Sequence, residues 1–188
     1  MNNSYQEYLN FANKLADAAS VTSMQYFRTS LDIDNKSDQS PVTIADKNTE
    51  LKIRSMIEKE YPSHGILGEE FDNINSNAEF IWVIDPIDGT RSYIAGHKDF
   101  GNLISLTQNK KPIIGIINCP AHNERWVGVK NQNSTLNQKP AKTSEIKKIE
   151  DAYLFTSGLY FDEPHLRNAV DKITNKVRYF RYGGDCYM

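Results

Sequence analysis

Cysteine is scarce in this sequence, which excludes the protein classes that depend on it. The 188 residues include two cysteines, Cys119 and Cys186. Two thiols cannot form a disulfide framework or a cysteine-rich metal site. We therefore interpret both as reduced thiols and expect a cytoplasmic protein.

Long apolar runs and blocks of one charge are also missing. No segment approaches the roughly 20 apolar residues of a membrane span. The first 20 residues carry Glu7 and Asp17 and no apolar centre, which is not typical of a signal peptide. Lysine and arginine number 22 against 24 acidic residues, and neither sign clusters, so no nucleic-acid-binding face is indicated. We expect neither a membrane nor a nucleic acid as partner.

The elements that the sequence does contain predict an α+β fold. Apolar residues recur at helical spacing over residues 6–27, and the capping pattern TIAD opens a second helix at Thr43, which Tyr61-Pro62 ends. Residues 31–42 are polar and indicate a loop or short hairpin. Four strand candidates follow, at 80–84, 102–108, 112–118 and 124–130. Helices followed by successive strands favour an antiparallel-rich sheet with helices packed on one face.

The composition divides the chain into three parts. We expect an N-terminal α+β domain over residues 1–135, a polar, lysine-rich linker over 136–150, and an incomplete C-terminal α/β domain over 151–188. The last part alternates strand, helix and strand, which is typical of a βαβ unit with parallel strands. Asp185 stands where a helix cap is expected, with three residues after it, so we expect the sequence to stop inside its second domain.

Two acids follow a buried strand in the stretch WVIDPIDGT, residues 82–90. If Glu69, Asp85 and Asp88 converge, each pair of like charges near 4 Å costs roughly 4 kcal/mol at an effective dielectric of 20. Such a cluster requires a cation or raised pKa values. Carboxylates without Cys or His favour Mg²⁺ over Zn²⁺, and the carbonyl of Ile87 could add another oxygen ligand.

The next residues, Gly89 and Thr90, are typical of an anion site. A helix that begins there would present backbone N–H groups to an anion, and glycine permits close approach. Metal ions beside such a helix end would suit a phosphate group. The structural alternative is equally simple, because DPIDGT contains turn and cap signals and Asp46 completes the Thr43 cap. Spacing alone leaves both interpretations open.

Three motifs in order resemble one family. They are K-x(3)-SPVT-x-AD from Lys36 to Asp46, GEE at 68–70 and WVIDPIDGT at 82–90. Together they resemble the inositol-monophosphatase-like family of Mg²⁺-dependent, lithium-sensitive sugar-phosphate phosphatases. The resemblance covers essentially the whole chain and implies a layered α-β-α-β sandwich whose first domain binds metal and phosphate.

The resemblance also implies a role for each matching residue. The implied ligands of two or three Mg²⁺ ions are Glu69, Asp85, Asp88 and the carbonyl of Ile87. Thr90, with Asp46 behind it and Glu69 near by, would orient and deprotonate the attacking water. The implied phosphate- and substrate-binding residues are Asp88, Gly89, Thr90, Arg91 and Asp185, and Lys36 matches a position near the metals. A metal-activated water would attack phosphorus without a covalent intermediate.

Within the family, three segments resemble the histidinol-phosphatase branch, which acts in histidine biosynthesis. They are residues 91–106, which begin with Arg91, residues 115–129 and residues 181–187. In that branch the residue matching Asp185 faces the substrate, and a carboxylate suits a cationic aminoalcohol better than a neutral inositol. Histidinol phosphate is thus the expected substrate. Inositol-1-phosphate and other sugar or nucleotide phosphates are alternatives.

The family pattern continues beyond this sequence into a Trp-Asp motif that supplies another metal ligand. Its absence favours weak or no turnover by these 188 residues, and the alternative is a catalytically inactive member that serves as a binding module. Uncovered apolar sheet surface would favour pairing with a second copy, so we expect a homodimer. We expect Trp82 and Trp126 in the core, and the histidines at the surface: His64, His97, His122 and His165.

Overall fold

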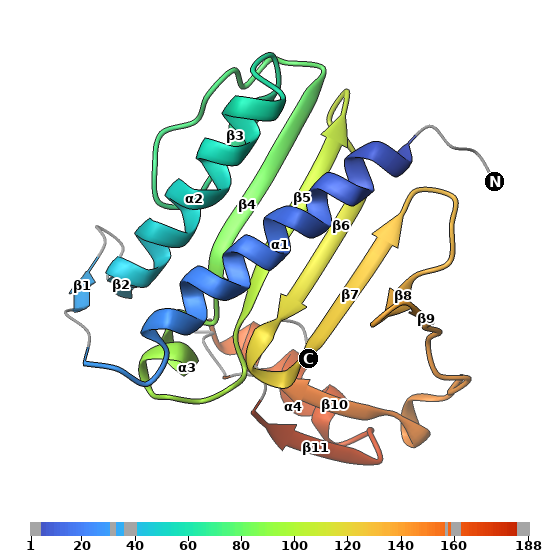
Figure 1. Cartoon of the computed structure of the whole chain (residues 1–188). Helices are drawn as coiled ribbons and strands as arrows, with labels where there is room; N and C mark the ends of the chain where they lie inside the picture. The colour runs from blue at the N-terminus through green and yellow to red at the C-terminus, as the bar shows by residue number, and fades with distance from the viewer. Residues whose placement is uncertain (1–4, 31–32, 36–40, 157, 159–162, 184–188) are drawn as a thin grey trace. The chain divides into compact units, whose positions relative to one another are not determined.

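A computed structural model describes residues 5–30, 33–35, 41–156, 158 and 163–183 (Figure 1). Lys36, Asp185 and Cys186 therefore lie outside the described residues. The chain divides into two compact units, Met1–Ala141 and Lys142–Met188. This division falls inside the segment that was predicted as a linker.

Two helices form one layer of the first unit. Helix α1 spans Gln6–Tyr26, and small buried residues such as Ala12 and Ala16 let it pack closely on its neighbours. Helix α2 spans Ile44–Glu60 and begins at Thr43 with the predicted capping box. Before it, β1 (Ile33–Asn35) pairs antiparallel with β2 (Pro41–Thr43), so the predicted hairpin is present.

A seven-stranded sheet forms the second layer, in the order β3-β4-β5-β6-β7-β8-β9. The strand bounds are Gly65–Leu67, Phe80–Asp88, Gly101–Gln108, Lys111–Cys119, Glu124–Val129, Thr135–Leu136 and Lys139–Pro140. The β3–β4 pair is parallel and the other pairs are antiparallel. The short helix α3 (Thr90–Ile94) follows β4, and a 3₁₀ turn (Pro120–His122) joins β6 to β7. The predicted antiparallel-rich α+β fold is confirmed.

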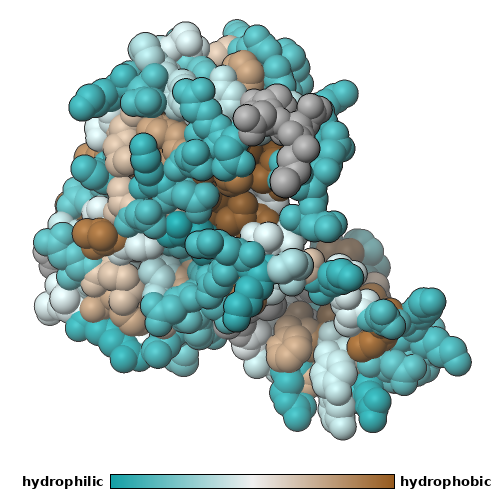
Figure 2. Space-filling model, turned by 45° about the vertical axis from the view of Figure 1, so that its right-hand side comes forward, coloured by the Kyte–Doolittle hydropathy of each residue, from teal (hydrophilic) through white to brown (hydrophobic). Residues whose placement is uncertain are grey.

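The main core lies between the two helices and the sheet. Figure 1 shows α1 passing across β4, β5 and β6, with α2 alongside α1 and next to β4. Trp82 is fully buried there, as predicted, with Ile84, Ile104 and Leu106 on the same face. The prediction for Trp126 is wrong: its side chain is 39% exposed, because its neighbour Val127 takes the core-facing position on β7. The face of the molecule shown in Figure 2 is mostly hydrophilic, with apolar side chains in small patches.

The prediction of a surface position is wrong for His64, which is 8% exposed. Its ring stacks on Tyr61 and Phe80 at centroid distances of 4.6 and 5.0 Å. Trp82 Nε1 donates to His64 Nδ1 over 3.2 Å, so the neutral ring carries its proton on Nε2. Burial lowers the pKa of His64.

The second unit contains the predicted βαβ pattern. A 3₁₀ turn (Ile149–Asp151) precedes β10 (Tyr153–Thr156), α4 (Pro164–Thr174) follows, and β11 (Tyr179–Tyr182) pairs parallel with β10. Tyr153 lies opposite Tyr179 in this pair, with ring centroids 5.0 Å apart.

Candidate active site

The DPIDGT stretch contains a bulge in strand β4. Asp85 pairs with Leu103 and Asp88 pairs with Gly101, so three steps along β4 match two steps along β5. In a regular strand, residues three apart point to opposite faces of the sheet. The extra residue in β4 changes this alternation, so the side chains of Asp85 and Asp88 can point to the same face of the sheet. Both side chains are half-buried.

An apolar cluster supports the bulge from behind. It is made of Ala45, Ile87, Tyr93 and Phe100. The Ile87 side chain is buried in it, while Gly89 caps α3 with a φ of 85°, a left-handed conformation that favours glycine. The five residues of α3 then begin at Thr90, as the sequence predicted.

Asp46, in the first turn of α2, is almost fully buried and faces this turn. Its Oδ2 accepts hydrogen bonds from the Thr43 backbone N–H at 2.8 Å and from the Thr43 hydroxyl at 2.6 Å. Burial raises the pKa of the Asp46 carboxyl, the two bonds from Thr43 lower it in part, and the negative charge of Glu69 raises it. Asp46 is therefore a more basic carboxylate than an exposed aspartate.

The hydroxyl of Thr90 lies between two acceptors. Thr90 Oγ1 is 3.0 Å from the Ile87 carbonyl and 3.4 Å from Asp46 Oδ1. A hydroxyl has one proton, and 3.4 Å is long for an O–H···O bond, so the proton goes to Ile87 in this structure. The predicted Thr90–Asp46 pair is brought together but is not tightly bonded.

A buried ion pair that the sequence interpretation missed holds the GEE segment. Glu50 Oε2 accepts the backbone N–H groups of Glu69 and Glu70 at 3.0 and 2.8 Å. Glu50 Oε1 accepts from Arg54 Nε at 2.7 Å, and both partners are buried. A Cβ at Gly68 would collide with this carboxylate, so glycine is required there. The sequence signal was position: Glu50 and Arg54 share the core-facing side of α2 with Ile53 and Ile57.

The donor chemistry of these residues fits Mg²⁺. Asp85, the Ile87 carbonyl and Asp88 follow one another along the end of β4 and offer oxygen ligands, and Glu69 is close enough to Asp46 to raise its pKa. The geometry is not closed, however. Within the described ranges, no three His, Cys, Asp or Glu side chains lie close enough together to hold a metal ion. Arg91 is exposed on α3.

A hollow lies elsewhere on the first unit. Its volume is about 940 Å³, and its lining includes Leu9, Val21, Met24, Arg125 and Val127 from α1 and β7. No candidate site residue lines it, so it does not mark the phosphate site.

Among the described residues, no helix is long and apolar enough to cross a membrane.

Comparison with known proteins gives one family. The model of the inositol monophosphatase family matches residues 4–187. Bifunctional phosphatase IMPL2, chloroplastic, of Arabidopsis thaliana is 41% identical over 93% of this chain and 51% of its own length. A histidinol-phosphatase of Chlorobaculum parvum is 36% identical over 95% of this chain and 70% of its own.

The solved structures agree with this match. An inositol monophosphatase from Zymomonas mobilis superposes with a TM-score of 0.85 at 41% identity, over 98% of this chain and 71% of that one. The chain thus spans about half the length of the Arabidopsis relative and about seven-tenths of the other two.

Proposed function

Because the chain belongs to the inositol monophosphatase family, we propose that it is the metal- and phosphate-binding part of a Mg²⁺-dependent phosphomonoesterase. The observation that supports the proposal is the bulge of β4, which lets Asp85 and Asp88 point to the same face of the sheet, just before the turn where Thr90 Oγ1 lies 3.4 Å from Asp46 Oδ1. Oxygen donors of this kind are the ligands that Mg²⁺ prefers.

In the proposal, Glu69, Asp85, Asp88 and the Ile87 carbonyl hold the metal ions. Bound Mg²⁺ would polarise the phosphoryl group and lower the pKa of a water molecule. The backbone N–H groups of Gly89 and Thr90 hold phosphate oxygens. They act as two oriented donors, because a helix as short as α3 adds little dipole. Glu69 reaches the site because Glu50 fixes its backbone.

In the proposal, Asp46 and Thr90 remove a proton from the attacking water. The single Thr90 proton can serve either the Ile87 carbonyl or Asp46, but not both at once. When the hydroxyl turns to Asp46, its oxygen lone pairs are directed to a water and can accept a proton from it. The raised pKa of Asp46 favours this role, since a more basic carboxylate is the better acceptor.

Histidinol phosphate is the substrate we place first. Residues 91–106 and 115–129 carry the pattern of that branch, and a curated relative with that name is 36% identical. The second candidate is inositol-1-phosphate, because a solved inositol monophosphatase is 41% identical. Arg91 and Asp185 stay proposed substrate-binding residues, and Lys36 stays a proposed residue near the metal ions.

The test is phosphate release from histidinol phosphate and from inositol-1-phosphate, with Mg²⁺ and with added Li⁺, beside direct titration of Mg²⁺. Asp88→Asn should abolish metal binding and turnover. Asp151→Asn makes the same change on an exposed side chain of the second unit and should change neither. Equal Mg²⁺ binding by both variants would refute the metal site, and Mg²⁺ binding without phosphate release would favour an inactive binding module.

Location and assembly belong to the same proposal. A buried Cys119 thiol suits the cytoplasm, whereas the name of the Arabidopsis relative assigns that protein to the chloroplast. We propose a cytoplasmic homodimer, which fractionation and light scattering would test.

A further inference from the structure

We infer that Asn102, on β5, is a positioning residue that sets the orientation of the DPID backbone and thereby the Mg²⁺ affinity of the site. Asn102 acts through the backbone, because its side-chain NH₂ group donates to the Pro86 carbonyl. The inference rests on the proposed function, because it concerns the same metal site. Its basis is a line of three buried or half-buried polar side chains across the sheet.

This line, which we name the polar seam, consists of Asn102, Asn118 and Arg125. The three residues lie opposite one another on β5, β6 and β7. Asn102 Nδ2 donates to the Pro86 carbonyl at 2.7 Å, and Asn118 Nδ2 donates to Asn102 Oδ1 at 2.8 Å. Arg125 Nε donates to Asn118 Oδ1 at 2.9 Å. The seam thus runs from the bulge of β4 across β5 and β6 to β7.

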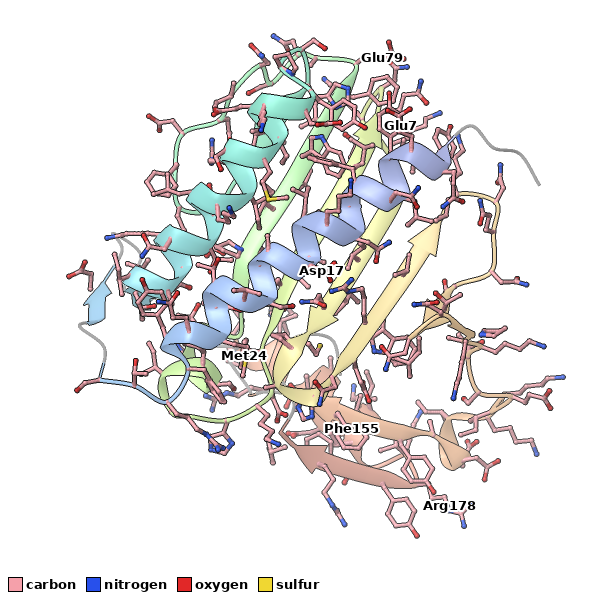
Figure 3. The ribbon with its side chains drawn as sticks, viewed as in Figure 1. Glu7, Asp17, Met24, Glu79, Phe155 and Arg178 are labelled. Carbon is pink, nitrogen blue, oxygen red and sulfur yellow. The ribbon has the colours of Figure 1, made fainter. Side chains whose placement is uncertain are left out.

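The direction of the seam is fixed by its outer end. Arginine has only donors, so Asn118 must turn its oxygen to Arg125 and its NH₂ group to Asn102. Asn102 must then turn its oxygen to Asn118 and its NH₂ group to Pro86. The guanidinium is itself held by Asp17 Oδ1 at 2.7 Å and by Asn13 Oδ1 at 3.2 Å, and both residues belong to α1. Figure 3 labels Asp17 on this helix.

The bond to Pro86 controls the next carbonyl along the chain. Asn102 binds the Pro86 carbonyl, and Thr90 Oγ1 lies 3.0 Å from the carbonyl of the next residue, Ile87. The two carbonyls belong to adjacent planar peptide groups, so a bond that fixes the first restricts the orientation of the second. That is the carbonyl proposed as a metal ligand, and it lies between Asp85 and Asp88.

The bond from Asn102 to the Pro86 carbonyl lies in the interior of the first unit. Asn102 and Pro86 are buried, so water does not compete for the Pro86 carbonyl. Ser23 of α1 also contacts this region. Asn102 Nδ2 lies 3.4 Å from Ser23 Oγ, and the Tyr93 hydroxyl donates to the Ser23 carbonyl at 2.6 Å. With Asn102 removed, the peptide groups of the bulge lose the bond that selects their orientation.

The test compares Asn102→Leu with Asn118→Leu. Both remove a buried amide of the seam, and both should lower the urea midpoint of unfolding. Asn102 bonds the bulge directly, whereas Asn118 acts on it through the orientation of the Asn102 amide, so Asn102→Leu should weaken Mg²⁺ binding more than Asn118→Leu does. The expected effect, measured by calorimetric titration without substrate, is a dissociation constant raised roughly tenfold or more, as for other groups that orient metal ligands. Saturating Mg²⁺ should largely restore phosphate release in this variant.

If Asn102→Leu does not fold, Asn102→Ser decides, because it keeps a hydroxyl donor on a shorter side chain and should weaken Mg²⁺ binding less. Equal dissociation constants for the Asn102 and Asn118 variants would overturn the inference and leave the proposed function standing. Absence of Mg²⁺ binding by the parent chain would overturn both. An Asn102-dependent Mg²⁺ affinity without phosphate release would support the inference and favour an inactive binding module over a phosphatase.

Discussion

Replacing Glu50 by glutamine should destabilise the first unit and loosen the GEE turn. The substitution keeps the shape of the side chain and removes its charge. Arg54 then stays buried without a countercharge, and its Nη1 and Nη2 still bond the carbonyls of Asp72 and Phe71 at 3.0 and 2.9 Å. The segment that carries Glu69 is held from α2 by these bonds and by the two backbone N–H groups that Glu50 accepts.

The unfolding free energy should fall by about 3–5 kcal/mol, the usual cost of removing one partner from a buried ion pair. Hydrogen bonds from backbone N–H groups to a charged acceptor are worth roughly 1.5–3 kcal/mol each, and part of this value is lost with the charge. A small domain has a total unfolding free energy of about 5–15 kcal/mol, so the change is large. An exposed pair of the same spacing would contribute only about 0.3–0.5 kcal/mol.

Urea unfolding followed by Trp82 fluorescence measures this loss, since Trp82 lies in the core of the same unit. Glu58→Gln is the matched control: it makes the same change on the same helix at an exposed position and should stay within about 0.5 kcal/mol of the parent. Hydrogen exchange at the Glu69 and Glu70 amides should accelerate in Glu50→Gln alone. Similar unfolding free energies and exchange rates in both variants would refute the reasoning.

Three further outcomes follow from the same contacts. Gly68→Ala places a Cβ against the Glu50 carboxylate, so its urea midpoint should fall below that of the parent. Gly89→Ala forces alanine to a φ of 85° and should lower the unfolding free energy by about 1 kcal/mol, whereas Gly115→Ala, where a Cβ meets no atom within 4 Å, should be close to neutral; equal losses would contradict the strain argument. Burial lowers the pKa of His64, so the stability that its neutral form contributes is present above the unfolded value of about 6.5 and is lost as the pH falls through the folded pKa. His64→Gln should flatten the dependence of unfolding free energy on pH between pH 7.5 and 5, and an unchanged slope would show that His64 is not responsible.

Local patterns predicted most of the fold. The helices α1 and α2 follow from apolar spacing and the Thr43 cap, and the hairpin strands β5 and β6 follow from their apolar runs. Strand β3 was missed, because three residues give no period and its parallel pairing with β4 is a tertiary contact. Trp126 was misplaced because a strand near the edge of a sheet leaves one face exposed.

The site was predictable where its chemistry is local and was missed where packing creates it. DPIDGT contains its acids, its turn and its helix start within a few residues. The Glu50–Arg54 pair resembles an ordinary exposed helix pair in sequence, and only the packing of α2 against the sheet buries it. His64 is a similar case, since Tyr8 of α1 and Phe80 of β4 surround it from distant parts of the chain.

Asp46 shows why the structural and chemical interpretations of this sequence were not alternatives. Its two carboxylate oxygens are divided: Oδ2 takes both Thr43 donors and caps α2, and Oδ1 faces Thr90. The cap therefore fixes the carboxylate without occupying the oxygen that a proton transfer would use. The same bonds offset part of the rise in the pKa of Asp46 that burial causes. The Thr43 cap fixes the start of α2 and thereby places the Asp46 carboxylate beside Thr90, in the turn after β4. The capping pattern and the proposed chemistry therefore require the same side chain in the same position.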